Sequence, residues 1–358
     1  MKKQLLLLSV CLLSVASVFA QKINKSELRA LQAFLNQPAV AAATNAQALK
    51  ISDLNNPGSW EGIKIEKGQI AEINWAGKNL AGELDLSGFT NLQKVNVSRN
   101  RLSSVKVDNT PSLNYLNAGN NRLTSIDVSG CPQLQDLRLY KNSLSTLNIS
   151  GTPLLTRLNV SANALIELNV SNSANLKTLS CNNNHMQVLI LNNCPNLKNV
   201  YAANNILADV TFAGLVSLEN LNLDNNRFKN FYIQDLPNLF TIMISSNKLE
   251  GFTVKNCPNI NDVDASFNDL TTFSVDGCPK LAFVDLSWND LTYVNLSNQY
   301  FLQRVNLANN QLLTVDVSFD NMLRYINVSG NYNLTNLETM GCTELHMLRG
   351  IEDDDMYV

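Results

Sequence analysis

Residues 134–144 read LQDLRLYKNSL, one instance of the frame LxxLxLxxNxL that decides the fold. Residues 281–291 repeat the frame as LAFVDLSWNDL, and copies of it return along the chain at one fixed interval. The asparagine of the frame recurs without an insertion at Asn100, Asn121, Asn142, Asn163, Asn184, Asn205, Asn226, Asn247, Asn268, Asn289, Asn310 and Asn331. A fixed period of this length predicts a solenoid in which each repeat forms one coil.

Each coil is predicted to be extended on both of its sides. Leu137 and Leu139 alternate with polar residues, which is the period of a short strand, and Leu147 and Ile149 alternate in the same way in the second half of the coil. Twenty-one residues are too few for a strand, two turns and a proper helix. Because stacked strands are about 4.8 Å apart whereas a helix is about 10 Å wide, strands on both sides predict only weak curvature.

The recurring asparagine is expected to turn inward at the bend after the first strand. Its amide carries two donors and an acceptor, so it can satisfy backbone groups of its own coil and of neighbouring coils. Without such a partner these backbone groups would be buried and unpaired.

The frame resembles that of leucine-rich-repeat proteins, and the 21-residue form with a strand-like second half is similar to bacterial internalin-type surface proteins. The resemblance covers residues 70–350, about 12 repeats. It implies a leucine-rich-repeat solenoid with a parallel β-sheet on the inner face, short extended segments on the outer face, weak curvature and a helical N-terminal cap. It also implies a binding protein, since the family binds diverse proteins and glycans. Some relatives carry a ladder of inward cysteines, whereas here only Cys181 lies at such a strand position.

The two ends differ from the repeats, as a solenoid requires. Residues 1–20 resemble a signal peptide with cleavage before Gln21, which predicts export to the periplasm, the cell surface or the medium. The alternative is a lipoprotein acylated at Cys11. Residues 21–69 are predicted to form a helical cap in which Ser26 is the N-cap of a helix, and Trp60 begins a stretch similar to plant-type caps. Residues 351–358 form an acidic C-terminal tail.

Composition excludes several classes of function. The formal net charge is −3 and no basic run occurs, so we do not expect nucleic acid to bind. No apolar stretch after Ala20 is long enough for a membrane helix, and no motif calls for a cofactor or a metal. We expect a monomer. The cysteines that precede a proline are interpreted as residues of a small buried slot, although Cys257 and Cys278 lie in adjacent coils and are candidates for a disulfide. The Asn-x-Ser triplets are interpreted as part of the repeat rather than as glycan acceptors.

One cluster departs from the small polar residues that otherwise face outward from the first strand. Phe267 and Trp288 precede the frame asparagine in consecutive coils, and their strand neighbours are Phe283, Asp262, Asp264 and Asp285. Exposed aromatic rings beside fixed acceptors suit sugar stacking or an interface anchor. The sequence therefore predicts a site for a protein or glycan partner at these six residues. The alternative is that the rings fold over the strand edge and only shield the backbone.

Other classes of function compete with a binding module. Asp264 and Asp285 are one repeat apart, so their carboxylates are expected about 5 Å from each other, which suits a retaining glycosidase or a weak calcium site. Against an enzyme, repeats without one inserted residue provide no active-site loop. A structural or adhesive component of the cell envelope, without a soluble ligand, is the remaining alternative.

Overall fold

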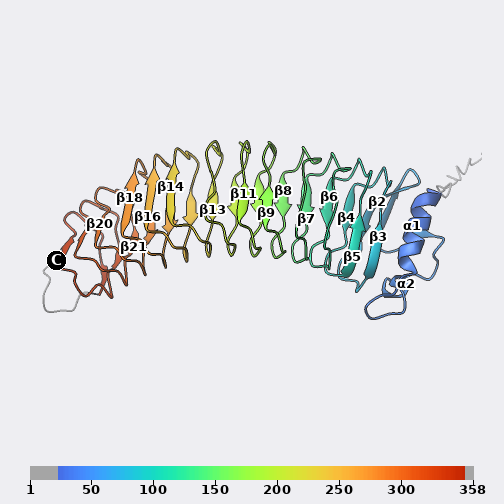
Figure 1. Ribbon diagram of the computed structural model, residues 1–358, viewed down its shortest axis with the longest axis horizontal. Helices are drawn as coiled ribbons and strands as arrows, with labels where there is room; N and C mark the ends of the chain where they lie inside the picture. The colour runs from blue at the N-terminus through green and yellow to red at the C-terminus, as the bar shows by residue number, and fades with distance from the viewer. Residues whose placement is uncertain (1–22, 351–358) are drawn as a thin grey trace, which may run out of the picture.

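The computed structural model describes residues 23–350, which form a shallow arc of stacked coils with a helical cap at one end (Figure 1). The predicted solenoid and its weak curvature are confirmed. The predicted signal peptide, residues 1–20, and the acidic tail, residues 351–358, lie outside the described residues. No helix among the described residues is long and apolar enough to cross a membrane.

One long sheet runs the length of the molecule. Its 15 strands are, in spatial order, β1 (Ile63–Glu66), β2 (Gln69–Asn74), β4 (Lys94–Asn96), β6 (Tyr115–Asn117), β7 (Asp136–Arg138), β8 (Arg157–Asn159), β10 (Thr178–Ser180), β12 (Asn199–Tyr201), β13 (Asn220–Asn222), β15 (Thr241–Met243), β17 (Asp262–Asp264), β19 (Phe283–Asp285), β21 (Arg304–Asn306), β23 (Tyr325–Asn327) and β25 (Met347–Arg349). Only β1 runs antiparallel to its neighbour. From β4 to β23 each strand pairs with the strand one repeat later, so equivalent residues form rows across the sheet.

The opposite side of the coils is also extended, as predicted, but its strands come in groups. These are β3 (Ala81–Asp85) with β5 (Arg101–Lys106); β9 (Glu167–Asn169) with β11 (Val188–Ile190); β14 (Asn230–Gln234), β16 (Gly251–Lys255) and β18 (Thr272–Asp276); and β20 (Tyr293–Asn295), β22 (Thr314–Asp316) and β24 (Asn336–Glu338). Beneath β14, β16 and β18, Phe231, Phe252 and Phe273 pack in a row with ring centroids 5.7 Å apart. Residues 123–128, 144–149 and 207–212 do not pair as strands.

The frame asparagines link the coils, which confirms their predicted role. The Asn142 Nδ2 donates to the carbonyls of Leu139 in its own coil (3.0 Å) and of Ala118 in the preceding coil (3.1 Å). Its Oδ1 accepts from the backbone N–H of Leu123 at 3.0 Å. Because the same pattern recurs from coil to coil, backbone groups that the bend would otherwise leave unpaired are satisfied along the stack.

The cap covers the first coil with a helix. Helix α1 (Lys25–Leu35) precedes the short helix α2 (Asn45–Ala48) and the 3₁₀ turn η1 (Pro57–Ser59). The N-cap of α1 is Asn24, whose side chain accepts from the Ser26 N–H at 3.0 Å, so the prediction of Ser26 as the N-cap was wrong by two residues. Phe34 stacks on Trp75 with centroids 5.9 Å apart. Asn45 also bridges the cap and the first coil, since its side chain donates to the Ala81 carbonyl at 2.9 Å and accepts from the Ala81 N–H at 3.1 Å. The cap therefore joins the solenoid through both aromatic packing and hydrogen bonds.

The last coils keep the frame with one extra residue. Val294 pairs with Val315 one 21-residue step later, whereas Val315 pairs with Leu337 and Ile326 with Leu348, each a step of 22. All six cysteines among the described residues are free. Cys131 illustrates the buried slot, where its sulfur lies 3.1 Å from the Thr110 hydroxyl of the preceding coil. In the same slot a hydrogen bond from Cys278 lowers the pKa of the Cys257 thiol to about 7.

Candidate functional site

The predicted site lies on the long sheet where β17 and β19 pair. The parallel register places Asp262 beside Phe283 and Asp264 beside Asp285, with Val263 buried beneath. Alternation along each strand explains this arrangement, since neighbours of an inward valine point outward. The structure therefore brings the three aspartates and Phe283 together on one face.

One oxygen of each paired carboxylate is occupied by its own coil. The Asp264 Oδ1 accepts from the Ser266 N–H (3.0 Å) and hydroxyl (2.7 Å), and Asp285 accepts from Ser287 in the same way. The Asn-x-Ser triplets make the same turn, as Asn327 does with the Ser329 N–H at 3.1 Å. The interpretation of these triplets as part of the repeat is thus supported. It also means that an asparagine in place of Asp264 or Asp285 could accept the same hydrogen bonds and form the same turn.

The aspartates form an acidic surface that is partly shielded from water. Burial raises the pKa of Asp262, and the negative charges of Asp264 and Asp285 raise it further. Burial likewise raises the pKa of Asp264, against the opposing effect of its hydrogen bonds from Ser266. Asp285 is held by one more donor, the Asn306 Nδ2 at 2.9 Å. Such carboxylates can accept hydrogen bonds from hydroxyl or amide groups of a ligand.

Phe267 and Trp288 lie at the turn that follows these strands, in a conformation that bulky residues seldom adopt. Their φ angles are +54° and +57°, in the left-handed region. Each side chain is 54% exposed. The two rings stack on each other with centroids 5.7 Å apart and an interplanar angle of 10°. The pair is thus an exposed aromatic stack, and this exposure argues against rings that only shield the strand edge.

The predicted residues divide into two adjoining parts. Asp262, Asp264, Phe283 and Asp285 line one hollow of about 220 Å³, together with Met243, Val284, Arg304 and Asn306. Phe267 and Trp288 do not line this hollow, because their turn carries them past the end of the strands. Among residues 23–350 no group of three or more histidine, cysteine, aspartate or glutamate side chains is arranged to hold a metal ion.

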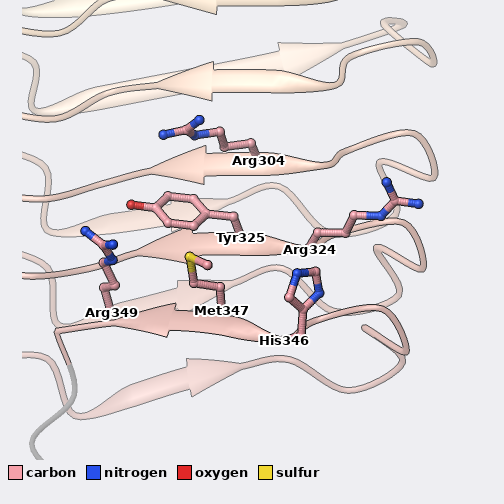
Figure 2. A pocket seen from close by; sticks show the side chains of 6 residues that line it. All are labelled: Arg304, Arg324, Tyr325, His346, Met347 and Arg349. Atoms are coloured by element: carbon pink, nitrogen blue, oxygen red, sulfur yellow. The ribbon is translucent and has the colours of Figure 1, made fainter.

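A second hollow, which the sequence reasoning missed, follows on the next strands of the same sheet (Figure 2). Its volume is about 360 Å³, and Arg304, Arg324, Tyr325, His346, Met347 and Arg349 line it. Arg304 lines both hollows. One sequence signal pointed to it: after Lys280 the chain has no lysine, and its only arginines are these three. The face is therefore acidic over β17 and β19 and basic over β21 to β25.

Comparisons with known proteins agree with this architecture. No protein-family model and no curated protein matches the chain. Among solved structures, the leucine-rich repeat domain of APL1B matches with a TM-score of 0.62 at 21% identity, over 72% of this chain and 81% of that one. The functional domain of InlJ from Listeria monocytogenes, described as including a cysteine ladder, matches with a TM-score of 0.51 at 22% identity, over 79% of this chain.

The chain spans 58% of the InlJ structure. A leucine-rich-repeat protein of Leptospira interrogans matches with a TM-score of 0.50 at 20% identity, over 72% of each chain. These likenesses show the leucine-rich-repeat solenoid and confirm the resemblance to internalin-type proteins at the level of the fold. At such identities they assign no ligand, so the function rests on the surface of this chain.

Proposed function

We propose that this chain is an exported binding module that recognises a protein or glycan through the long sheet around β17 and β19, with no catalytic role. The observation that carries the proposal is the exposed stack of Phe267 and Trp288. The leucine-rich-repeat fold, which presents a broad continuous surface, supports it. Export is supported by the sequence of residues 1–20.

The backbone at Phe267 and Trp288 argues that these rings are not there for stability. In five other coils the same left-handed position is held by an asparagine, which tolerates it well, and in the remaining coils it is held by residues such as Arg99, Lys141, Ala162 and Ser246. Phe267 and Trp288 are the only aromatic residues at this position of the repeat. A bulky residue there costs on the order of 1 kcal/mol or more. An exposed aromatic pair returns about 0.5–1.5 kcal/mol by stacking, so the rings offer the fold no clear gain. A partner that packs on the pair would supply the reason for them.

The carboxylates on the two strands that lead into this turn would give such a partner its orientation. Asp264 and Asp285 are held by their turns, so they do not lose side-chain freedom when a ligand binds. A ligand that stacks on Trp288 and Phe267 and donates hydrogen bonds to these oxygens would satisfy both parts of the site. This combination favours a recognition surface over a structural or adhesive envelope component, which is the second candidate function.

The test is a binding screen of the chain from Gln21 onward against a glycan array and extracellular-matrix proteins. A Phe267→Asn/Trp288→Asn variant carries the residue that several other coils have at this position, so it is expected to fold. Its affinity for the ligand found in the screen is expected to fall by at least about tenfold, roughly 1.4 kcal/mol. The matched control is Tyr300→Asn/Phe301→Asn, because these rings are exposed to a similar extent, 58% and 51%, outside the site. This control is expected to bind as the wild type does.

A ligand that the first variant retains would refute the site. If the wild-type chain binds no ligand in the screen and self-associates in analytical ultracentrifugation, the structural or adhesive component is favoured instead.

A further inference from the structure

The arginines of the second hollow differ from the arginine on an earlier part of the same sheet. Arg138 lies over the Tyr115 ring, 5.4 Å from its centroid, and binds the Asp136 carboxylate at 2.7 Å. Arg304 lies over the Tyr325 ring at 4.7 Å in a similar way, and Arg349 at 5.9 Å. Within residues 23–350, however, neither of them forms a salt bridge. The placement of an arginine over a tyrosine ring is thus repeated at Tyr325, but without the carboxylate partner that Asp136 provides for Arg138.

The basic side chains converge from three neighbouring strands. Arg304, Tyr325 and Met347 form a row across β21, β23 and β25, and Arg349 follows Met347 on the last strand. Figure 2 shows Arg304 and Arg349 near the hydroxyl end of Tyr325, whereas Arg324 and His346 lie toward the other end of the strands. Positive charge is thus present at both ends of a floor formed by Tyr325 and Met347.

This chemistry selects an anion. The planar fork of a guanidinium matches a carboxylate or sulfate with two parallel hydrogen bonds, and stacking on an aromatic ring holds the fork in place. Arg304, Arg324 and Arg349 line this hollow, and none of them forms a salt bridge within residues 23–350, so their positive charge is not neutralised by an ion pair there.

The neighbouring hollow decides what carries the anion. It shares Arg304 with the basic hollow and presents Asp262, Asp264 and Asp285. An acidic peptide that continued along the face would meet like charges there, which cost binding energy. Sugar hydroxyls would instead donate to these carboxylates, and a sugar ring stacks well on an aromatic face.

We propose that the β21–β25 hollow binds the carboxylate or sulfate of an acidic sugar, whose neutral neighbours in the same glycan extend over the aspartates toward Phe267 and Trp288. The proposal rests on the proposed function and deepens it, because it names the class of ligand and the strands, β21 to β25, that bind its charged group.

The experiment compares each acidic glycan with a neutral counterpart by isothermal titration calorimetry. The probes are sialyllactose beside lactose, trigalacturonic acid beside its methyl ester, a sulfated oligosaccharide beside its desulfated form, and a glutamate-rich peptide. At least one acidic glycan is expected to bind, its neutral form about tenfold or more weakly, and binding is expected to weaken with salt. Arg304→Gln/Arg349→Gln should lower the affinity by about tenfold or more, whereas the exposed pair Arg122→Gln/Arg227→Gln should leave it unchanged.

The acidic residues Glu352, Asp353, Asp354 and Asp355 follow Arg349 closely in the sequence, so they are a potential competitor. Each titration is therefore repeated with these four residues replaced by their amides. Binding of an acidic glycan by either protein, with loss in the Arg304→Gln/Arg349→Gln variant, supports the proposal. Failure in both proteins overturns it, and so does equal binding of the neutral forms or preferential binding of the peptide.

The outcome separates this inference from the proposed function. A glycan or protein that needs Phe267 and Trp288 but is indifferent to Arg304 and Arg349 would retain the binding module and refute the acidic-sugar site. Absence of any ligand that depends on either pair would refute both.

Discussion

The early and late coils share one frame but present different surfaces. Between β6 and β13 the outward side chains satisfy one another: Arg138 binds Asp136, and Asn220 donates to Asn199 at 2.7 Å. From β17 to β25 the face instead carries the Phe267–Trp288 stack, three aspartates and arginines without a salt-bridge partner among the described residues. Because both regions are built on the same frame of buried apolar residues and asparagines, the late surface is not needed to build a coil. Its departures from the early pattern are therefore the places where function is to be sought.

The largest expected effect tests whether the frame asparagines stabilise the early and the late coils to the same extent. Asn205→Ala and Asn289→Ala each remove an amide that donates to the carbonyls of its own and the preceding coil, at 3.0–3.1 Å, and accepts one backbone N–H. Since the buried backbone groups are left unpaired, each variant is expected to lose about 3–5 kcal/mol of unfolding free energy. Urea denaturation followed by circular dichroism measures the loss. A loss in one region and none in the other would break the comparison.

The next effect concerns a buried acid of the late coils, Asp320, in a slot where the early coils carry Thr110, Cys131 or Thr152. One oxygen of Asp320 accepts from the Gln299 N–H at 2.7 Å and the other has no partner. Burial raises its pKa to about 8, and the nearby Asp316 adds to the rise. Between about pH 4 and pH 8 the folded chain keeps a proton that the unfolded chain has released, so the unfolding free energy falls as pH rises through this window.

Asp320→Asn is therefore expected to stabilise the late coils by about 2 kcal/mol or more at pH 8, because it removes the ionisable group and keeps the acceptor for Gln299. Thermal unfolding at pH 5 and pH 8 measures the effect. The control is Asp127→Asn in the early region, whose carboxyl has a lowered pKa through hydrogen bonds from Ser129 and should show no such gain. Equal gains for Asp320→Asn at the two pH values would contradict the prediction.

A smaller effect sharpens the contrast between stability and recognition. Phe267→Asn/Trp288→Asn relieves two strained backbone positions and removes one exposed stack, so the unfolding free energy is expected to stay the same or rise by up to about 1 kcal/mol. Urea denaturation measures it. A loss of more than about 1 kcal/mol would mean that the rings support the coils after all.

The smallest effect separates the charge of the aspartates from their role in the turn. Asp264→Asn/Asp285→Asn restores the asparagine turn of the other coils. Without added metal, the free energy of unfolding is therefore expected to change by less than about 0.5 kcal/mol, and the melting temperature only slightly. Calcium is expected to leave the melting temperature of both proteins unchanged, because these carboxylates spend one oxygen each on the turn. A calcium-dependent rise in the wild type that the variant loses would establish an ion site instead.

The fold and the aromatic stack were predictable because both follow the repeat. Phe267 and Trp288 are one repeat apart, so equal phase places them side by side. The basic hollow was not predictable in this way, since Arg304, Arg324 and Arg349 are unequally spaced and do not share a phase of the repeat. They meet because Arg324 directly precedes its strand, whereas the other two lie on theirs, and because the extra residue before β24 shifts the last coil.

The role of the aspartate turns was missed for a different reason. Asp264-Ala-Ser266 has the same pattern as the Asn-x-Ser triplets, but its charge drew attention to ion binding. The hydrogen bond of one oxygen to Ser266 depends on the bend after the strand, which the three-residue pattern alone does not fix.

The uniform step of the frame from Asn100 to Asn331 makes every coil boundary in this stretch geometrically equivalent to every other. A recombination event that deletes or duplicates one whole unit among the early coils would rejoin matching ends and leave the late surface unaltered. Each such event would move that surface relative to the cap by about 4.8 Å. The length of this solenoid is thus open to adjustment by gene rearrangement in discrete units, independently of what its far end recognises.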